Sequence, residues 1–150
     1  MKFHTQYRRN PSREQARNLT EYIANDRHRG GIVVDRAGEI TDEDINGFAL
    51  YASRCHLIRL HTATFRETYE PKMLANTGRA VARNYLDGLW LVGVHVSNPE
   101  NPHIHIAQAG TTQEVWMDPA DIREVRSAIA DRVGESCGEL SKSKQRMPSS

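Results

Sequence analysis

The 150-residue sequence predicts an α+β fold in which an antiparallel sheet of about five strands is packed by helices on one face. Residues 56–65, 90–96 and 103–109 alternate apolar and polar side chains, the pattern of strands with one buried face. Other segments carry apolar residues three and four positions apart, as amphipathic helices do. The Pro- and Asn-rich turn between 96 and 103 is short enough for a hairpin, which makes the strands on either side antiparallel.

In the N-terminal half, the expected elements are an edge strand at 2–8, a helix at 11–27, a strand at 32–34 and a helix at 41–53. Asn10 suits the N-cap of the first helix, and Pro11 suits its first position. Gly30 and Gly31 end this segment. Thr41, followed by three acidic residues, favours the start of the second helix, because a hydroxyl can cap it and carboxylates stabilise the positive end of its dipole.

In the C-terminal half, the expected elements are strands at 56–65, 90–96 and 103–109, helices at 71–87 and 118–134, and a short strand at 114–117. Pro71 and Pro119 suit the first positions of the two helices. Residues 1–134 are therefore expected to form one domain. Residues 135–150 are rich in Ser, Lys and Gly and are expected to be a disordered polar tail.

The strands are predicted to share two opposite faces. The apolar face, expected to lie beneath the helices, carries Ile58, Leu60, Val92, Val94, Val96, Ile104 and Ile106. The other face is expected to carry Arg59, His61, Gly93, His95, His103, His105 and Ala107. Because small residues lie beside the histidines there, this second face is predicted to have room for a substrate.

Composition favours a water-soluble, cytoplasmic protein. The formal net charge is only +1, which excludes a uniformly basic nucleic-acid binder, but residues 1–30 hold seven Lys or Arg against three Asp or Glu. This basic end suits either phosphate contacts or a solvated helix surface. Cys55 and Cys137 are far apart and indicate neither a disulfide framework nor a zinc finger. The chain contains no apolar run of membrane length.

Three of the seven histidines, His95, His103 and His105, predict a metal site. His103 and His105 leave the same face of a strand, and a hairpin with an even register brings His95 beside them. Imidazole is a common ligand of divalent ions, and an all-histidine set leaves coordination positions open for substrate or water. The alternative is that they are ordinary polar strand residues.

The run from His95 to Ile106 resembles the histidine-hydrophobe-histidine motif of HUH relaxases of the MobP type, which nick DNA in plasmid conjugation and mobilisation. A second segment, Ala16–Ala24, resembles the family's first motif, a helix that carries the catalytic tyrosine, here Tyr22. All five tyrosines precede His103, as in relaxases and unlike rolling-circle initiators and single-tyrosine transposases. The resemblance covers about residues 11–134, and the histidine run is its specific part.

The resemblance implies an endonuclease in which Tyr22 attacks a DNA phosphodiester and becomes linked to its 5′ phosphate, so that the strand can later be religated. It implies a divalent ion (Mg, Mn or Zn) held by the three histidines. Arg17, Arg59 and His61 are expected to contact DNA. Trp90 or Tyr69 is expected to stack a base. The implied partners are single-stranded DNA at a transfer origin and an accessory mobilisation protein.

The chain departs from the family pattern at several positions. Ser97 stands where many relaxases carry an acid, and Glu100 is a weak substitute. The gap between His95 and His103 is about one residue longer than the family pattern. Tyr22 could also be a core aromatic of an amphipathic helix, with Tyr85 as the alternative nucleophile.

Three other functions remain open. One is a non-catalytic DNA- or metal-binding accessory domain of a mobile element. Another is a histidine-triad nucleotide hydrolase, although Ala107 stands where the triad needs a third histidine. The last is a two-histidine phosphoesterase, for which His95-Val96-Ser97 supplies one motif and His61-Thr62-Ala63 fails at its last position.

Overall fold

The computed structural model describes residues 1–98, 100–137 and 147. Its elements are β1 (Lys2–Arg9), α1 (Arg13–Ala24), β2 (Ile32–Asp35), β3 (Gly38–Glu39), α2 (Asp42–Ala52), β4 (Leu57–Thr64), α3 (Pro71–Tyr85), β5 (Leu89–His95), β6 (His103–Gly110), α4 (Thr112–Val115) and α5 (Pro119–Val133). In the described chain, the strands form one antiparallel sheet of six strands in the order β1-β4-β6-β5-β2-β3. The α+β prediction is confirmed, and the short β2–β3 hairpin brings the sheet to six strands.

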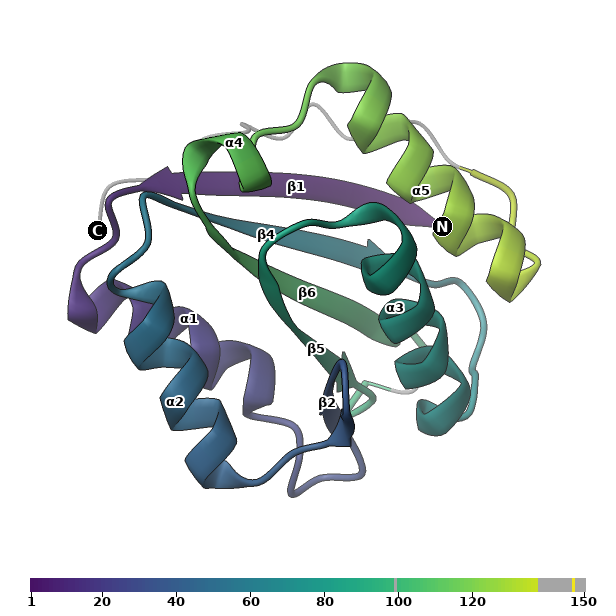
Figure 1. Ribbon diagram of the computed structural model, residues 1–150. Helices are drawn as coiled ribbons and strands as arrows, with labels where there is room; N and C mark the ends of the chain where they lie inside the picture. Colours follow the sequence, from purple (N-terminus) through teal and green to yellow (C-terminus); the bar gives the residue numbers. More distant parts are fainter. Residues whose placement is uncertain (99, 138–146, 148–150) are drawn as a thin grey trace.

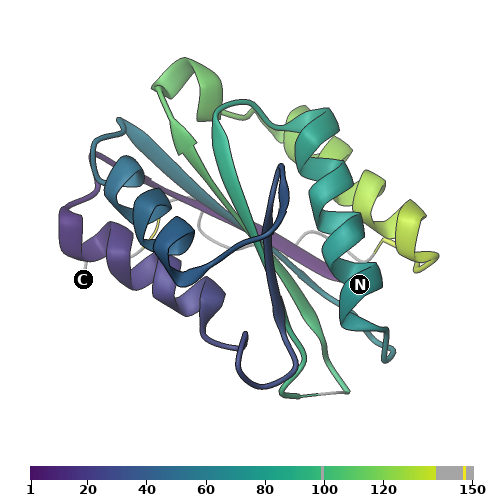
Figure 2. The same cartoon turned by 60° about the horizontal axis from the view of Figure 1, so that its bottom comes forward.

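Helices cover both faces of the sheet, so the prediction that they pack on one face is wrong. Figures 1 and 2 show α1 and α2 on one side of the sheet and α3 and α5 on the other. Each pair has its own core, with Ile23 of α1 and Phe48 of α2 buried in one and Leu74 of α3 and Ile129 of α5 in the other. An amphipathic helix is stable only when its apolar side is covered, and one face has too little area for all four long helices.

The register of β4 corrects the predicted faces. Leu60 is paired with Ala107 of β6, so Ile58 and Leu60 share the histidine face, beneath α1 and α2. Arg59 and His61 therefore point to the opposite face, where they are 0% and 1% exposed. Alternation within a strand shows which of its residues share a face. Only the pairing register shows which residues of the neighbouring strand lie on that same face of the sheet. The prediction that Arg59 and His61 lie beside the histidines is wrong.

Arg59 and His61 are both held in place by hydrogen bonds. Arg59 donates from Nε to the carbonyl of Val115 over 3.3 Å and from Nη1 to Oγ1 of Thr5 over 3.2 Å. Burial lowers the pKa of Arg59 to about 10, so the guanidinium stays charged at neutral pH. His61 donates from Nε2 to Oε1 of Gln108 over 3.1 Å, because an amide oxygen can only accept.

His61 is expected to make folding sensitive to mild acid. Burial chiefly lowers its pKa to about 3, with the charge of Arg59 adding to the effect and the bond to Gln108 opposing it. Because this pKa lies below the unfolded value, the neutral ring contributes stability above about pH 6.5, and the contribution is lost as the pH falls towards 3. When the pH falls from 7 to 5, His61 is expected to lower the free energy of unfolding by about 2 kcal/mol.

Urea titrations of the wild type and of His61→Gln at the two pH values measure this cost as the difference in their losses. The exposed His28 offers a matched control, since His28→Gln is expected to retain the wild-type pH dependence. Equal losses in the wild type and His61→Gln would show that His61 does not carry the effect.

Local sequence explains two differences from the predicted elements. Residues 114–117, expected as a strand, belong partly to the short helix α4. Thr111 and Glu114 form a reciprocal capping box there, with each side chain bonded to the other's backbone N–H. A second capping box, between Ser12 and Gln15, starts α1 two residues after the expected Asn10.

The chain after α5 returns to the sheet at two described points. Glu135 accepts a hydrogen bond of 2.7 Å from the hydroxyl of Tyr69 and lies 3.3 Å from the N-terminal ammonium of Met1. The N–H of Met147 donates to the carbonyl of Tyr7 over 2.7 Å. Most of the tail predicted at 135–150 lies outside the described residues. Among the described helices, none is long and apolar enough to cross a membrane.

Candidate active site

The three histidines of the predicted metal site lie together on the face covered by α1. Strands β5 and β6 pair His95 with His103 and Gly93 with His105. This is the even register that the sequence required, so that part of the prediction is confirmed. The ring centroids of His95 and His105 are 4.3 Å apart, and those of His103 and His105 are 5.8 Å apart.

Tyr22 of α1 lies against this histidine cluster. Its ring approaches His95 and His105 edge-on, with centroid distances of 5.6 and 5.1 Å. The side chain is 48% exposed, so the alternative that Tyr22 is a core aromatic is wrong. The structure thus brings together the tyrosine and the histidines of two sequence motifs that lie far apart in the chain.

Helix α1 lies close to β5 because Gly93 of that strand has no side chain. A Cβ atom on Gly93 would lie 2.5 Å from Cγ2 of Ile23 and closer still to the Ile23 carbonyl oxygen. The same carbonyl, near the C-terminal end of α1 where backbone acceptors lack helical partners, accepts a hydrogen bond of 2.8 Å from Nε2 of His95. The backbone of α1 therefore touches the strand one residue away from Tyr22.

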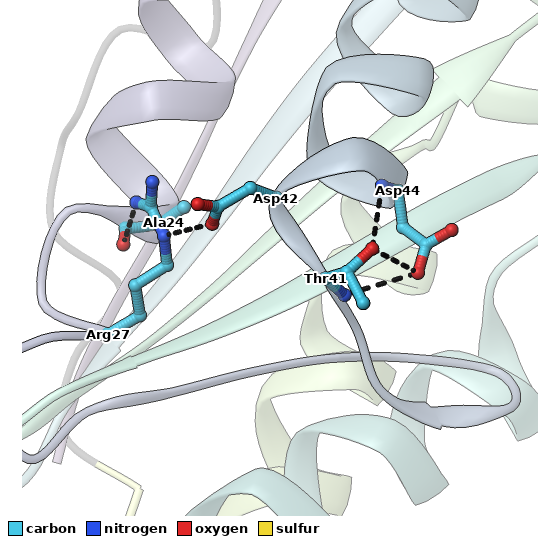
Figure 3. A network of polar contacts seen from close by, with 5 residues as sticks. All are labelled: Ala24, Arg27, Thr41, Asp42 and Asp44. Carbon is cyan, nitrogen blue, oxygen red and sulfur yellow. Dashed lines mark hydrogen bonds and ion pairs between the residues drawn. The ribbon is translucent and has the colours of Figure 1, made fainter.

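A polar network also joins the end of α1 to the start of α2 (Figure 3). Arg27 donates from Nη1 to the carbonyl of Ala24 over 2.7 Å, and its Nε lies 2.9 Å from Oδ1 of Asp42. Thr41 and Asp44 form the capping box that starts α2. Because the ion pair is solvent-exposed, it contributes little free energy, but it connects the two helices that cover the histidine face.

The environment of His103 and His105 favours the neutral form of these two rings. Burial first, and then the nearby His95 and His103, lowers the pKa of His105 well below its usual value. The pKa of His103 is also lowered, by burial and then by His95. Since a metal ion binds the neutral imidazole, both rings are in the ligating form at neutral pH.

The hydrogen bonds of His95 and His105 each occupy one ring nitrogen of the imidazole. Nδ1 of His105 is bonded to Oγ1 of Thr62 over 3.1 Å, while its Nε2 is buried and has no hydrogen-bond partner among the described atoms. Because a carbonyl only accepts, Nε2 of His95 carries a proton and donates it to Ile23, which leaves Nδ1 as the nitrogen that could face a ligand. A histidine whose other nitrogen is held in this way is typical of metal sites.

Imidazole nitrogens are a donor type that divalent ions accept, but the described side chains are not arranged to hold an ion. Within the residues that the structure describes, no three His, Cys, Asp or Glu side chains stand as ligands around a common point. Binding of an ion would require the imidazoles to move from the positions that they have in this structure.

Asp26, which the sequence gave no reason to select, is a buried carboxylate at the end of β5. It accepts hydrogen bonds of 2.6 and 3.1 Å from the N–H groups of Val96 and Ser97. Burial alone would raise the pKa of Asp26, but these bonds and the charge of His95 lower it overall. The strand end where Ser97 replaces an expected acid is thus held by a carboxylate from the loop after α1.

His4 is a fourth histidine on this face that the sequence analysis missed. It pairs with Thr62 of β4, which pairs in turn with His105. Its charge is among the causes that lower the pKa of His103 and His105. The alternation of residues 2–8 puts His4 on one face of an edge strand, but only the pairing of β1 with β4 shows that it is the histidine face.

The remaining predicted site residues lie away from the histidines. Arg17 is exposed on α1. Tyr85, the alternative nucleophile, is exposed and lines a cavity with Gln108, which belongs to the opposite face of the sheet. Trp90 is 3% exposed, and the ring of Tyr69 is partly buried against the core, edge-on to Phe65.

Comparison of the chain with protein-family models and with curated proteins found no match in either set.

Proposed function

We propose that the protein nicks and religates single-stranded DNA through a covalent link between Tyr22 and a 5′ phosphate, assisted by a divalent ion at the histidines. The observation that carries this proposal is the half-exposed ring of Tyr22, edge-on to His95 and His105. A nucleophile beside neutral nitrogen ligands is the arrangement that phosphodiester transfer requires. The resemblance to HUH relaxases, carried by the same residues, supports the same chemistry.

The reaction is a balanced exchange of esters. The phenol oxygen of Tyr22 attacks phosphorus, the bond from phosphorus to the 3′ oxygen breaks, and the strand leaves with a 3′ hydroxyl. The phenolic proton passes to a base or to water, and the departing 3′ oxygen acquires a proton. Attack by a 3′ hydroxyl on the phosphotyrosine reverses the exchange and religates the strand. A bound divalent ion would supply positive charge to the scissile phosphate.

Each described contact has a part in this chemistry. His95, His103 and His105 would hold the ion, with Thr62 orienting His105. The carbonyl of Ile23 orients His95. The exposed Arg17 on α1 is available to contact the DNA backbone. The expected DNA is a transfer origin of a mobile element, with an accessory mobilisation protein as a second partner.

Two observations favour a second function, the non-catalytic accessory domain of a mobile element, in its DNA-binding form. The imidazoles do not stand as a finished three-ligand site in the described structure, and Ser97 replaces an acid. A histidine-triad hydrolase has less support, because Ala107, where the triad needs its third histidine, is buried under α1 and α2.

An adduct assay on the wild-type protein tests the proposal. A pool of random-sequence single-stranded oligodeoxynucleotides, labelled at either end, is incubated with Mg²⁺ or Mn²⁺ or with a chelator and run on a denaturing gel. We expect the 3′ label to migrate with the protein and the 5′ label to leave on a shorter fragment, only when the ion is present. DNA binding without cleavage would favour the accessory domain, and nucleotide hydrolysis without DNA cleavage would exclude a relaxase.

The amount of bound metal provides a second test, of the histidines as ligands. His105→Ala is expected to lose most of the Mn²⁺ that the wild type retains after dialysis, whereas the exposed His28→Ala is expected to retain it. Unchanged Mn²⁺ in His105→Ala would exclude His105 as a ligand.

A further inference from the structure

Strand β1 presents a row of polar and basic side chains to the histidine face. Its pairing with β4 opposes Lys2 to Thr64 and His4 to Thr62, and these threonines oppose His103 and His105 of β6. Because alternate residues of a strand share a face, Gln6 and Arg8 continue the same row. The members of this row, from one end of β1 to the other, are Lys2, His4, Gln6 and Arg8.

Helix α1 packs over β5 and β6, and beyond it the β1 side of the histidine face holds a groove whose lining includes Tyr22. The groove has a volume of about 280 Å³. Gln6 and Arg8 line it from β1, and Asn18 lines it from α1. Leu19 and Leu60 supply apolar surface between them. Among the described residues that line the groove, none is acidic.

The chemistry of the groove matches a single strand of nucleic acid better than a peptide or a small molecule. Same-face residues of a strand repeat about every 7 Å, close to the phosphate spacing of an extended single strand. Lys2 and Arg8 carry positive charge at two positions of the row. Apolar side chains accept the flat faces of bases, and the amides of Gln6 and Asn18 offer donors and acceptors to base edges.

We propose that this groove, together with the part of the β1 row that continues beyond it, binds the stretch of single-stranded DNA that flanks the scissile phosphate. Arg8 in the groove and Lys2 beyond it would contact phosphates, and Leu19 and Leu60 would lie under the bases. The proposal rests on the proposed function for the identity of the strand as DNA and for the position of the cut at Tyr22. It replaces the buried Arg59 and His61 as the expected DNA contacts. Met147 also lines the groove, so a bound strand passes beside Met147 or displaces it.

The test measures binding without cleavage. In the full-length Tyr22→Phe variant, the affinity for a fluorescent random-sequence single-stranded oligodeoxynucleotide is measured by anisotropy at several salt concentrations. Adding Lys2→Ala or Arg8→Ala is expected to weaken binding at least fivefold and to reduce the slope of log affinity against log salt by about 0.7 for each lost phosphate contact. Thermal melting of each variant checks that the fold is retained.

Arg9 provides the matched control. It is the neighbour of Arg8 but points to the opposite face, where it stacks over Tyr7 and Trp116 with centroid distances of 5.8 Å. Arg9→Ala is expected to bind within twofold of its parent. The proposal is overturned if Arg9→Ala weakens binding as much as Arg8→Ala, or if neither Lys2→Ala nor Arg8→Ala has an effect.

The two proposals fail separately. If the groove variants lose binding while the wild type forms no covalent adduct, the groove stands and nicking does not. If the wild type forms the adduct while binding is insensitive to Lys2 and Arg8, nicking stands and the strand takes another path.

Discussion

Tyr22→Phe is expected to abolish the covalent protein–DNA adduct, reducing it by at least about 1000-fold, as loss of an enzyme nucleophile does. Phenylalanine keeps the ring that lies against His95 and His105 but has no oxygen to attack phosphorus. Because the side chain is half exposed, its hydroxyl is not needed for the fold, and the free energy of unfolding is expected to change by less than about 0.5 kcal/mol. The measurement is the adduct band on a denaturing gel, with urea unfolding as the check on stability.

Tyr85→Phe is the matched control for the same assay. Tyr85 is nearly as exposed as Tyr22, at 43% against 48%, but it lines a cavity on the opposite face of the sheet. The Tyr85→Phe variant is expected to form as much covalent adduct as the wild type. An adduct that persists in Tyr22→Phe and disappears in Tyr85→Phe would assign the nucleophile to Tyr85 and would remove the observation on which the proposed function depends.

Gly93→Ala is expected to have the second largest effect, although position 93 carries no functional group. The added methyl group would overlap the backbone carbonyl and Cγ2 of Ile23, so α1 would have to move away from β5. We expect a loss of about 1–3 kcal/mol of unfolding free energy, the usual cost of overpacking a core. Since a displacement of about 1 Å at a reacting group can cost about 100-fold in rate, adduct formation is expected to fall by that factor.

Gly47→Ala controls for the chemical change itself. Gly47 lies within α2, and a Cβ atom there would meet no heavy atom within 4 Å. Alanine is the better helix former, so this variant is expected to gain about 0.5–1 kcal/mol and to form the adduct at the wild-type rate. If Gly93→Ala keeps both wild-type stability and wild-type adduct formation, the close contact between α1 and β5 does not position Tyr22.

Much of the candidate site could be predicted because its residues lie in short segments with a clear period. The alternation around His103 and His105 fixes their common face, and the short turn after His95 limits the hairpin to a few registers. The helical period of Ala16–Ala24 predicts a helix that carries Tyr22. These inferences needed only local geometry, and the structure agrees with them.

The parts that the sequence did not predict depend on contacts between distant segments. The face of Arg59 follows from pairing β4 with β6, which no residue near Arg59 determines. Asp26 and His4 reach the site from a loop and an edge strand that are placed by packing. The presence of helices on both faces likewise depends on the total area that four amphipathic helices must bury.

The two halves of the site belong to parts of the fold that differ in local stability. His103 and His105 lie on β6, which is hydrogen-bonded to β4 on one side and to β5 on the other. Tyr22 lies on a single 12-residue helix with one exposed side, near its C-terminal end. Such a helix end opens at a lower free energy than the centre of a sheet. Partial loosening of α1 can therefore separate the tyrosine from the histidines while the sheet stays folded, so the proposed activity can be lost before the protein unfolds globally.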